Sequence, residues 1–306
     1  MEMFTTMITP YKADGSVDLD TARKYVDWYF ENGLDGIFAI CQSSEIFFLT
    51  LEERIALNKC VYSRAKELEQ ASGRRFTVVS SGHISDSIED QIEELNAVWA
   101  SGTDALILIT NRLDPNNEGD DVFIANGEKL LAALPDDVKL GFYECPAPYK
   151  RLVTPKILDW CMSTGKFIYM KDTCCDAAEI ARRTAQLKGS GFKLLNANCQ
   201  TLLETMRAGA DGYCGIMANF HPKLYAWLGT NYADEKADLV QSMIGTFGFT
   251  ESLAYPLTAK YHMNLCGIPT EPIGRSRKSS DLTDYHKSCM QQMKLASDYL
   301  EEMLCI

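Results

Sequence analysis

Residues 31–40, ENGLDGIFAI, place a glycine between the end of an amphipathic helix and the start of an apolar strand. Glycine accepts the left-handed backbone conformation with which many helices end. The same junction recurs in ASGTDALILI (100–109), MSTGKFIYM (162–170) and RAGADGYCGI (207–216). Repeated helix-to-strand junctions of this kind indicate parallel β/α units.

Apolar strands and amphipathic helices alternate along most of the chain. The candidate strands are 4–10, 36–40, 77–80, 105–110, 139–145, 167–171, 192–196 and 212–217. The candidate helices between them are 20–32, 51–70, 87–101, 122–134, 155–163, 177–187 and 201–208. After about residue 233 only helical patterns follow, at 236–253, 257–265 and 285–303.

This order predicts an α/β fold, a (β/α)8 TIM barrel over residues 1–232 with a C-terminal helical extension over 233–306. An open, doubly wound sheet is the alternative. However, no GxGxxG motif follows the first strand and no Walker-type loop occurs in the chain. Helix-start signals support the boundaries: Thr50 with Glu53, Ser85 or Asp86, and Thr154 before Pro155.

The composition excludes several functional classes. With a net charge of −12, nucleic acid and anionic membranes are poor partners for this chain. The first residues, MEMFTTMITP, lack the basic region and apolar core of a signal peptide. The longest apolar runs are too short to span a bilayer.

The pattern of cysteines indicates a reducing compartment, and the pattern of histidines argues against a metal-binding site. The eleven cysteines are scattered and contain no CxxC pair, which is typical of reduced thiols in a cytoplasmic protein. The four histidines are widely spaced and show no ligand pattern, so we expect no bound metal.

In a β/α barrel, the C-terminal ends of the strands surround the active site. Lys171 ends the sixth predicted strand, Tyr143 and Glu144 lie at the end of the fifth, Arg112 follows the fourth and CQSSE (41–45) follows the second. A lysine at such a position can simply extend its amine to water. In apolar surroundings, however, it loses part of its preference for the charged form and attacks carbonyl groups.

These residue types suit carbonyl chemistry. An amine and a ketone form an imine, whose protonated nitrogen withdraws electrons so that a neighbouring carbon–carbon bond can form or break. A phenol beside the imine can exchange protons with the departing oxygen.

Five motifs resemble the dihydrodipicolinate synthase and N-acetylneuraminate lyase superfamily of Schiff-base aldolases. They are TPYKADGSVDLD (9–20), GLDGIFAICQSSEIFFLTLEER (33–54), FYECP (142–146), YMKDTCCD (169–176) and AGADGYCGIMANFHP (208–222). The resemblance runs from residue 4 to about residue 270. The spacing of Tyr143 and Lys171, 171 − 143 = 28, also agrees with this family.

The resemblance implies a role for each matching residue. Lys171 would form the Schiff base with a pyruvate-type 2-keto acid, and Tyr143 would relay protons. Ser43 and the backbone of Ser44 would hold the keto acid's carboxylate, while Glu45 would fix their loop. The family is typically homotetrameric and needs no cofactor, so we expect a homo-oligomer, either a tetramer or a dimer.

The chain departs from the family pattern at several of these positions. Gln42 stands where the family has a relay threonine, and an amide can hydrogen-bond but cannot pass on a proton. Arg112, in TNRLDP, stands where the synthase branch has a relay tyrosine. Glu144 is interpreted as a specificity contact or as an ion-pair partner of Arg112. Cys214, on the eighth strand, completes the residues expected to contact substrate.

The leading hypothesis is a Schiff-base lyase or aldolase that acts on pyruvate or a related 2-keto acid by aldol cleavage, condensation or dehydration. One alternative is dihydrodipicolinate synthase itself, with Lys150 or Arg151 binding the second substrate's carboxylate. Another is a catalytically weak sensor that binds a keto acid, an alternative motivated by Gln42 and Arg112.

Overall fold

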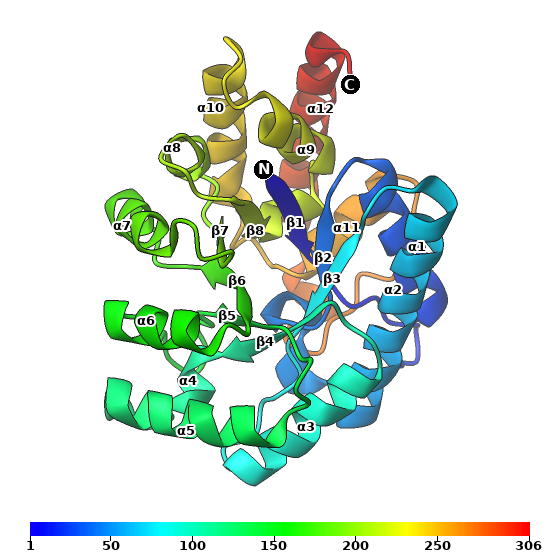
Figure 1. The fold of residues 1–306 in the computed structure, drawn as a ribbon. Coiled ribbons are helices and arrows are strands. Elements are labelled where there is room, and N and C mark those ends of the chain that lie inside the picture. The colour runs from blue at the N-terminus through cyan, green and yellow to red at the C-terminus, as the bar shows by residue number, and fades with distance from the viewer.

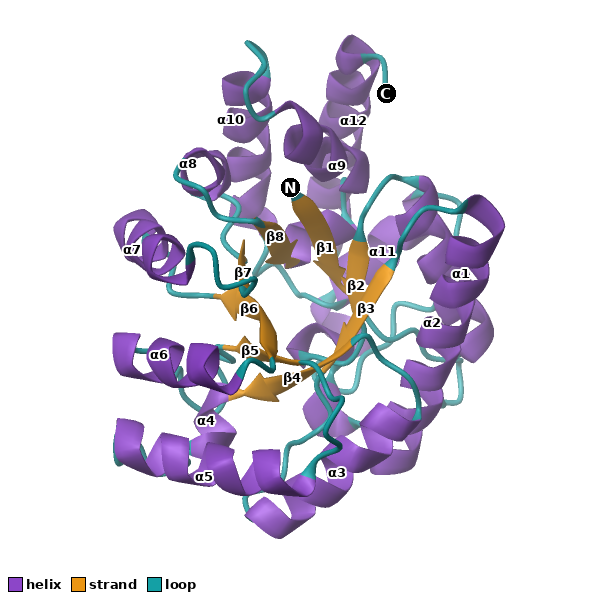
Figure 2. Ribbon diagram, viewed as in Figure 1, coloured by secondary structure: helices purple, strands orange, loops and turns teal.

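Eight parallel strands close into a barrel in the computed structural model, which describes residues 1–306 (Figures 1 and 2). They are β1 (Glu2–Thr6), β2 (Gly36–Phe38), β3 (Thr77–Ser80), β4 (Ala105–Ile109), β5 (Leu140–Tyr143), β6 (Phe167–Asp172), β7 (Lys193–Asn196) and β8 (Gly212–Gly215). Each strand pairs with the next, and β1 closes on β8 with Phe4 opposite Cys214. The predicted (β/α)8 fold is therefore confirmed.

Helices surround the barrel as a ring (Figure 2). They are α1 (Leu19–Glu31), α2 (Leu51–Ser72), α3 (Ile88–Ala100), α4 (Thr110–Leu113), α5 (Asp120–Ala133), α6 (Pro155–Thr164), α7 (Ala177–Leu187), α8 (Leu202–Arg207) and α9 (Pro222–Asn231). Thr50 and Glu53 form the expected capping box of α2, and Thr154 caps α6. The cap of α3 is Ser87, which accepts from the Asp90 amide, so the prediction of Ser85 or Asp86 was wrong.

Sequence patterns overestimated the length of several strands. β1 ends at Thr6, yet Met7 and Ile8 remain fully buried because the chain leaves the sheet and continues through the core as a loop. Helices α4 and α9 were not expected. Pro222 opens α9, a helix-start signal that the sequence did contain.

The extension consists of α10 (Ala237–Phe247), α11 (Leu257–Leu265) and α12 (Asp284–Leu304). α10 and α12 lie beside α9 on one side of the barrel (Figure 1). Val240, Ile244 and Met263 belong to the same apolar cluster as β1 and β2, so the extension shares the core of the barrel. Whether 1–232 and 233–306 are separate folding units stays a prediction. No helix is both long and apolar enough to cross a membrane.

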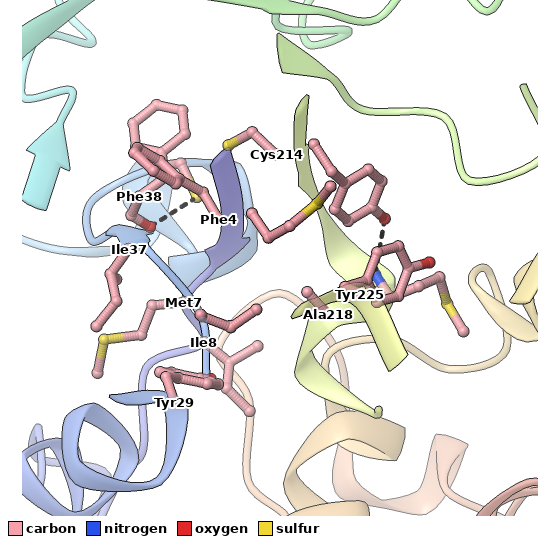
Figure 3. Packing of buried hydrophobic residues seen from close by; sticks show 14 of the residues in the cluster. Phe4, Met7, Ile8, Tyr29, Ile37, Phe38, Cys214, Ala218 and Tyr225 are labelled. Atoms are coloured by element: carbon pink, nitrogen blue, oxygen red, sulfur yellow. Dashed lines mark hydrogen bonds between the residues drawn. The ribbon is translucent and has the colours of Figure 1, made fainter. Parts of the chain in front are cut away.

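Two apolar clusters hold the structure together. The larger fills the barrel around β1 and β2, where Figure 3 shows Phe4, Phe38 and Cys214 gathered beside one another. The smaller lies between β4–β6 and helices α5 and α6. At its centre, the rings of Phe142 and Phe167 stack with their centroids 4.7 Å apart.

Replacing Phe142 with alanine should lower the free energy of unfolding by about 3–5 kcal/mol, because it removes a fully buried ring and leaves a cavity. Urea denaturation measures this change. Phe249, which is 77% exposed, provides the control: Phe249→Ala should change stability by less than about 0.5 kcal/mol. Equal effects of the two substitutions would contradict the assignment of Phe142 to a packed core.

Candidate active site

A cavity of about 850 Å³ opens at the C-terminal ends of the strands, where active sites of β/α barrels lie. Four of the predicted site residues line it: Gln42, Ser43, Tyr143 and Lys171. The other four, Ser44, Arg112, Glu144 and Cys214, do not. The structure thus brings half of the predicted set together around one space.

Lys171 reaches the cavity from β6. Side chains alternate along a strand, so Tyr169 and Lys171 point into the barrel, with Tyr169 deeper. Lys171 is only 8% exposed, and its Nζ lies 4.2 Å from the centroid of the Tyr143 ring and 5.7 Å from that of Phe38. No carboxylate or hydrogen-bond acceptor engages this amine, so its nitrogen is free to meet a ligand.

Tyr143 ends β5 directly opposite Lys171 in the parallel register. Its hydroxyl donates a hydrogen bond to Gln42 Oε1 at 3.2 Å. Burial raises the pKa of Tyr143 well above its ordinary value, so the phenol stays protonated at neutral pH. The site therefore presents a neutral acid beside the lysine, with its orientation set by Gln42.

The loop after β2 forms a 3₁₀ turn over Gln42–Ser44. Ser44 serves the turn itself, since its Oγ accepts from the Cys41 amide at 2.6 Å and its own amide donates to the Cys41 carbonyl at 3.1 Å. Ser43 faces the cavity and donates to Thr6 Oγ1 at 2.9 Å. The Tyr255 hydroxyl, which belongs to another lining residue, has no hydrogen-bond partner.

Glu45 fixes this loop through a buried ion pair. Its Oε2 lies 3.0 Å from Lys260 Nζ, and its Oε1 accepts from the amides of Arg275 and Ser276 at 2.8 and 2.7 Å. Burial alone would raise the pKa of Glu45, but Lys260 and the Ser276 hydrogen bonds outweigh it and lower the pKa. The carboxylate of Glu45 is thus ionised, and both of its oxygens have partners. These contacts connect the loop after β2 to α11 and to the segment that follows α11.

Glu144 and Arg112 do not pair with each other, so that prediction was wrong. Glu144 follows the inward-facing Tyr143, and strand alternation turns its side chain outward to Arg183 on α7, at 2.9 Å. Arg112 instead pairs with Asp86 at 2.7 Å. Because Glu144 is fully buried away from the cavity, its proposed specificity contact is also withdrawn.

Arg183 binds two fully buried carboxylates at once, and its Nε also contacts the more exposed Glu179 at 3.0 Å. Besides Glu144 it contacts Asp172, the residue that follows Lys171. Burial raises the pKa of Glu144 to about 7, the charge of Asp172 adds to this effect, and Arg183 opposes it. The ion cluster of Arg183, Glu144 and Asp172 therefore connects the ends of β5 and β6. It lies on the outer side of the strands, next in sequence to Tyr143 and Lys171.

The remaining predicted residues have other surroundings. Cys214 lines a small apolar space beneath Lys171 instead of the main cavity. Arg151 is held by Asp114 at 2.8 Å and by Asp120 at 2.7 Å, so its guanidinium is already neutralised. Lys150 lines the cavity and donates to the Thr173 carbonyl at 2.7 Å.

Sequence reasoning missed several lining residues: Thr173, Asn198, Glu251, Tyr255 and Arg277. Asn198 could have been found, because it follows the seventh predicted strand. The last three lie in the extension, where neither strand ends nor motif spacing mark a position as facing the site.

Comparisons with known proteins agree with this geometry. The model of the dihydrodipicolinate synthetase family matches residues 1–113. A 4-hydroxy-tetrahydrodipicolinate synthase from Saccharophagus degradans is 25% identical over 298 residues, covering 95% of this chain and 97% of that protein.

Solved structures show the same fold. YagE, a prophage protein of the dihydrodipicolinic acid synthase family from E. coli K12 in complex with pyruvate, has a TM-score of 0.82 at 21% identity and covers 98% of both chains. A chloride-inhibited dihydrodipicolinate synthase from Acinetobacter baumannii, complexed with pyruvate, has a TM-score of 0.79 at 19% identity, covering 97% of this chain and 98% of that one.

A parallel eightfold barrel with a buried lysine and a phenol facing one cavity is the arrangement of an enzyme of the class I aldolase type, which uses lysine to form a Schiff base. Within that class, the chain is similar to the dihydrodipicolinate synthetase family, whose model matches residues 1–113.

Replacing Arg183 with methionine should lower the free energy of unfolding by about 3–5 kcal/mol, because it leaves two buried carboxylates without a counter-ion. Its neighbour Arg182 is the matched control, since it contacts only the more exposed Glu179 and Gln186. Arg182→Met should cost at most about 1 kcal/mol. If thermal or urea unfolding shows that Arg183→Met and Arg182→Met lose the same free energy of unfolding, the ion cluster of Arg183 does not stabilise the strand ends.

Proposed function

We propose that the protein is a Schiff-base-forming lyase or aldolase that acts on pyruvate or a related 2-keto acid, with Lys171 as the nucleophile. The observation that carries this proposal is the unpaired amine of Lys171, buried at the base of the cavity and 4.2 Å from the ring of Tyr143. The pyruvate complexes of the two solved relatives support the choice of keto acid.

The first steps follow from the neighbours of the amine. Neutral Lys171 attacks the keto carbon, and the resulting carbinolamine loses its oxygen as water to leave an iminium ion. Tyr143, protonated because its pKa is raised, donates the proton that the departing oxygen needs. Water from the cavity can then restore the phenol's proton.

Hydroxyl groups at one side of the cavity suit the keto acid's carboxylate. Ser43 Oγ lies on this wall beside Tyr255, whose own hydroxyl oxygen is buried, and a hydroxyl donor binds a carboxylate through a charge-assisted hydrogen bond.

A synthase that condenses pyruvate with a second acidic substrate is less well supported. Of the two cations predicted to bind the second carboxylate, Arg151 is committed to Asp114 and Asp120 and does not line the cavity. Lys150 lines it but is engaged by a backbone carbonyl. Arg277 also lines the cavity, and only its Nε is engaged, by the Tyr255 carbonyl, so a second carboxylate would bind at this guanidinium instead. The proposal therefore covers cleavage, condensation and dehydration.

We also propose a cytoplasmic homo-oligomer. The eleven free cysteines suit a reducing compartment. Sedimentation of the purified protein would distinguish a tetramer or a dimer from a monomer.

Incubation with pyruvate and sodium borohydride should add the mass of one reduced pyruvate to the protein, and peptide mapping should place it on Lys171. Borohydride reduces the imine to a stable amine, so the label reports Schiff-base formation directly. Lys171→Arg should abolish the adduct, whereas Lys287→Arg, on the exposed side of α12, should not. An adduct on another lysine, or none, would refute the proposal.

Tyr143→Phe should slow adduct formation by about 10²–10⁴-fold without preventing it, because the departing oxygen loses its proton donor while the amine remains. Samples quenched with borohydride at successive times measure the rate. Tyr299, 67% exposed, gives the control variant Tyr299→Phe, whose rate should equal that of the wild type. An unchanged rate in Tyr143→Phe would remove this residue from proton transfer.

A further inference from the structure

Glu251 is an unpaired carboxylate in the same cavity as Lys171. It follows the short 3₁₀ turn Gly248–Thr250 of the extension and lines the cavity, yet its side chain makes no hydrogen bond and no ion pair. The other lining carboxylate, Glu45, is saturated by Lys260, Arg275 and Ser276. Glu251 is thus the lining carboxylate available to a ligand.

The site needs a group that can accept a proton from carbon or from a substrate hydroxyl. Tyr143 is already the proton donor for the departing oxygen, and its hydrogen-bond partner, the amide oxygen of Gln42, carries no proton to pass on. The Cys175 thiol, at the exposed rim, donates to the Thr173 carbonyl. An ionised carboxylate is a suitable proton acceptor, and Glu251 provides one.

We propose that Glu251 is the proton-transfer residue for C3 of the keto acid bound to Lys171, an inference that rests on the proposed function. In the iminium ion from pyruvate, the Glu251 carboxylate removes a proton from the methyl carbon. The C–H electron pair forms the C2–C3 double bond, and the C=N π pair moves onto nitrogen to give a neutral enamine. Return of the proton from Glu251 to C3 reverses the step.

The same group serves cleavage of a longer substrate, a 4-hydroxy-2-keto acid. Glu251 takes the proton of the C4 hydroxyl, the C3–C4 electron pair passes into the enamine, and the C4 fragment leaves as an aldehyde. The protonated carboxyl then donates to C3, and water hydrolyses the imine to release pyruvate and free Lys171.

The electrostatic surroundings of Glu251 fit a proton that is taken up and returned. Burial raises its pKa above the ordinary value, and the charge of Lys171 opposes this effect. Conversion of the iminium ion to an enamine removes that charge, so the carboxyl binds its proton more tightly until the charge returns. The titratable groups that feel the charge of Glu251, besides Lys171, are Cys199, Tyr213, Tyr225 and Tyr255.

Exchange of the methyl protons of pyruvate with deuterated water, followed by proton NMR, tests this role without knowledge of the second substrate. Glu251→Gln should still give the borohydride-trapped adduct on Lys171 but should exchange the methyl protons about 10²–10⁴-fold more slowly. Glu251→Asp should recover part of the rate. Glu235→Gln, which makes the same change on the exposed surface, should match the wild type.

The pH profile separates proton transfer from a structural effect. The wild-type exchange rate should rise with pH as Glu251 ionises, and Glu251→Gln should lack this acidic limb. The assignment would be overturned if Glu251→Gln exchanged the methyl protons at the wild-type rate, or if its exchange rate still rose with pH in the acidic range. It would also be overturned if the wild-type protein formed the adduct but did not exchange these protons. A wild-type protein that forms no adduct would instead overturn the proposed function.

Discussion

The guanidinium of Arg183 neutralises two buried carboxylates, Glu144 and Asp172, at the ends of adjacent strands. Each carboxylate directly follows an inward-facing residue of the site, Tyr143 or Lys171. Because strand side chains alternate, one ion cluster outside the barrel fixes the positions of two side chains inside it. The relative positions of Tyr143 and Lys171, on which the proposed chemistry depends, are therefore fixed by a residue of α7 on the outer side of the strands.

A second buried charge links the barrel to its extension. Lys260 of α11 neutralises Glu45, and Arg275 and Ser276 saturate the remaining acceptor sites of this carboxylate. The extension also contributes Tyr255 and Glu251 to the cavity wall. The strand ends thus supply the amine and the phenol, while the extension holds the loop of Ser43 and brings the additional hydroxyl and carboxylate.

Much of the barrel could be predicted from local signals, because glycine-terminated helices and apolar strands recur in order. The same alternation placed Lys171 and Tyr143 at strand ends and therefore at one cavity. Alternation within the strand also implies that Glu144 points outward, but it could not identify the partner Arg183, which lies on a later helix. Glu251 and Tyr255 were missed because their positions depend on how the extension folds back over the barrel, which no periodicity encodes.

The Glu45–Lys260 contact also has a consequence for the order in which the protein is made. The loop after β2 leaves the ribosome 215 residues before its counter-ion Lys260, and the Arg275 and Ser276 amides follow later still. Until then Glu45 lacks these partners and must be solvated by water instead. The lysine and the phenol of the site therefore emerge before the groups that fix the loop of Ser43, so the cavity is completed only after both have been made.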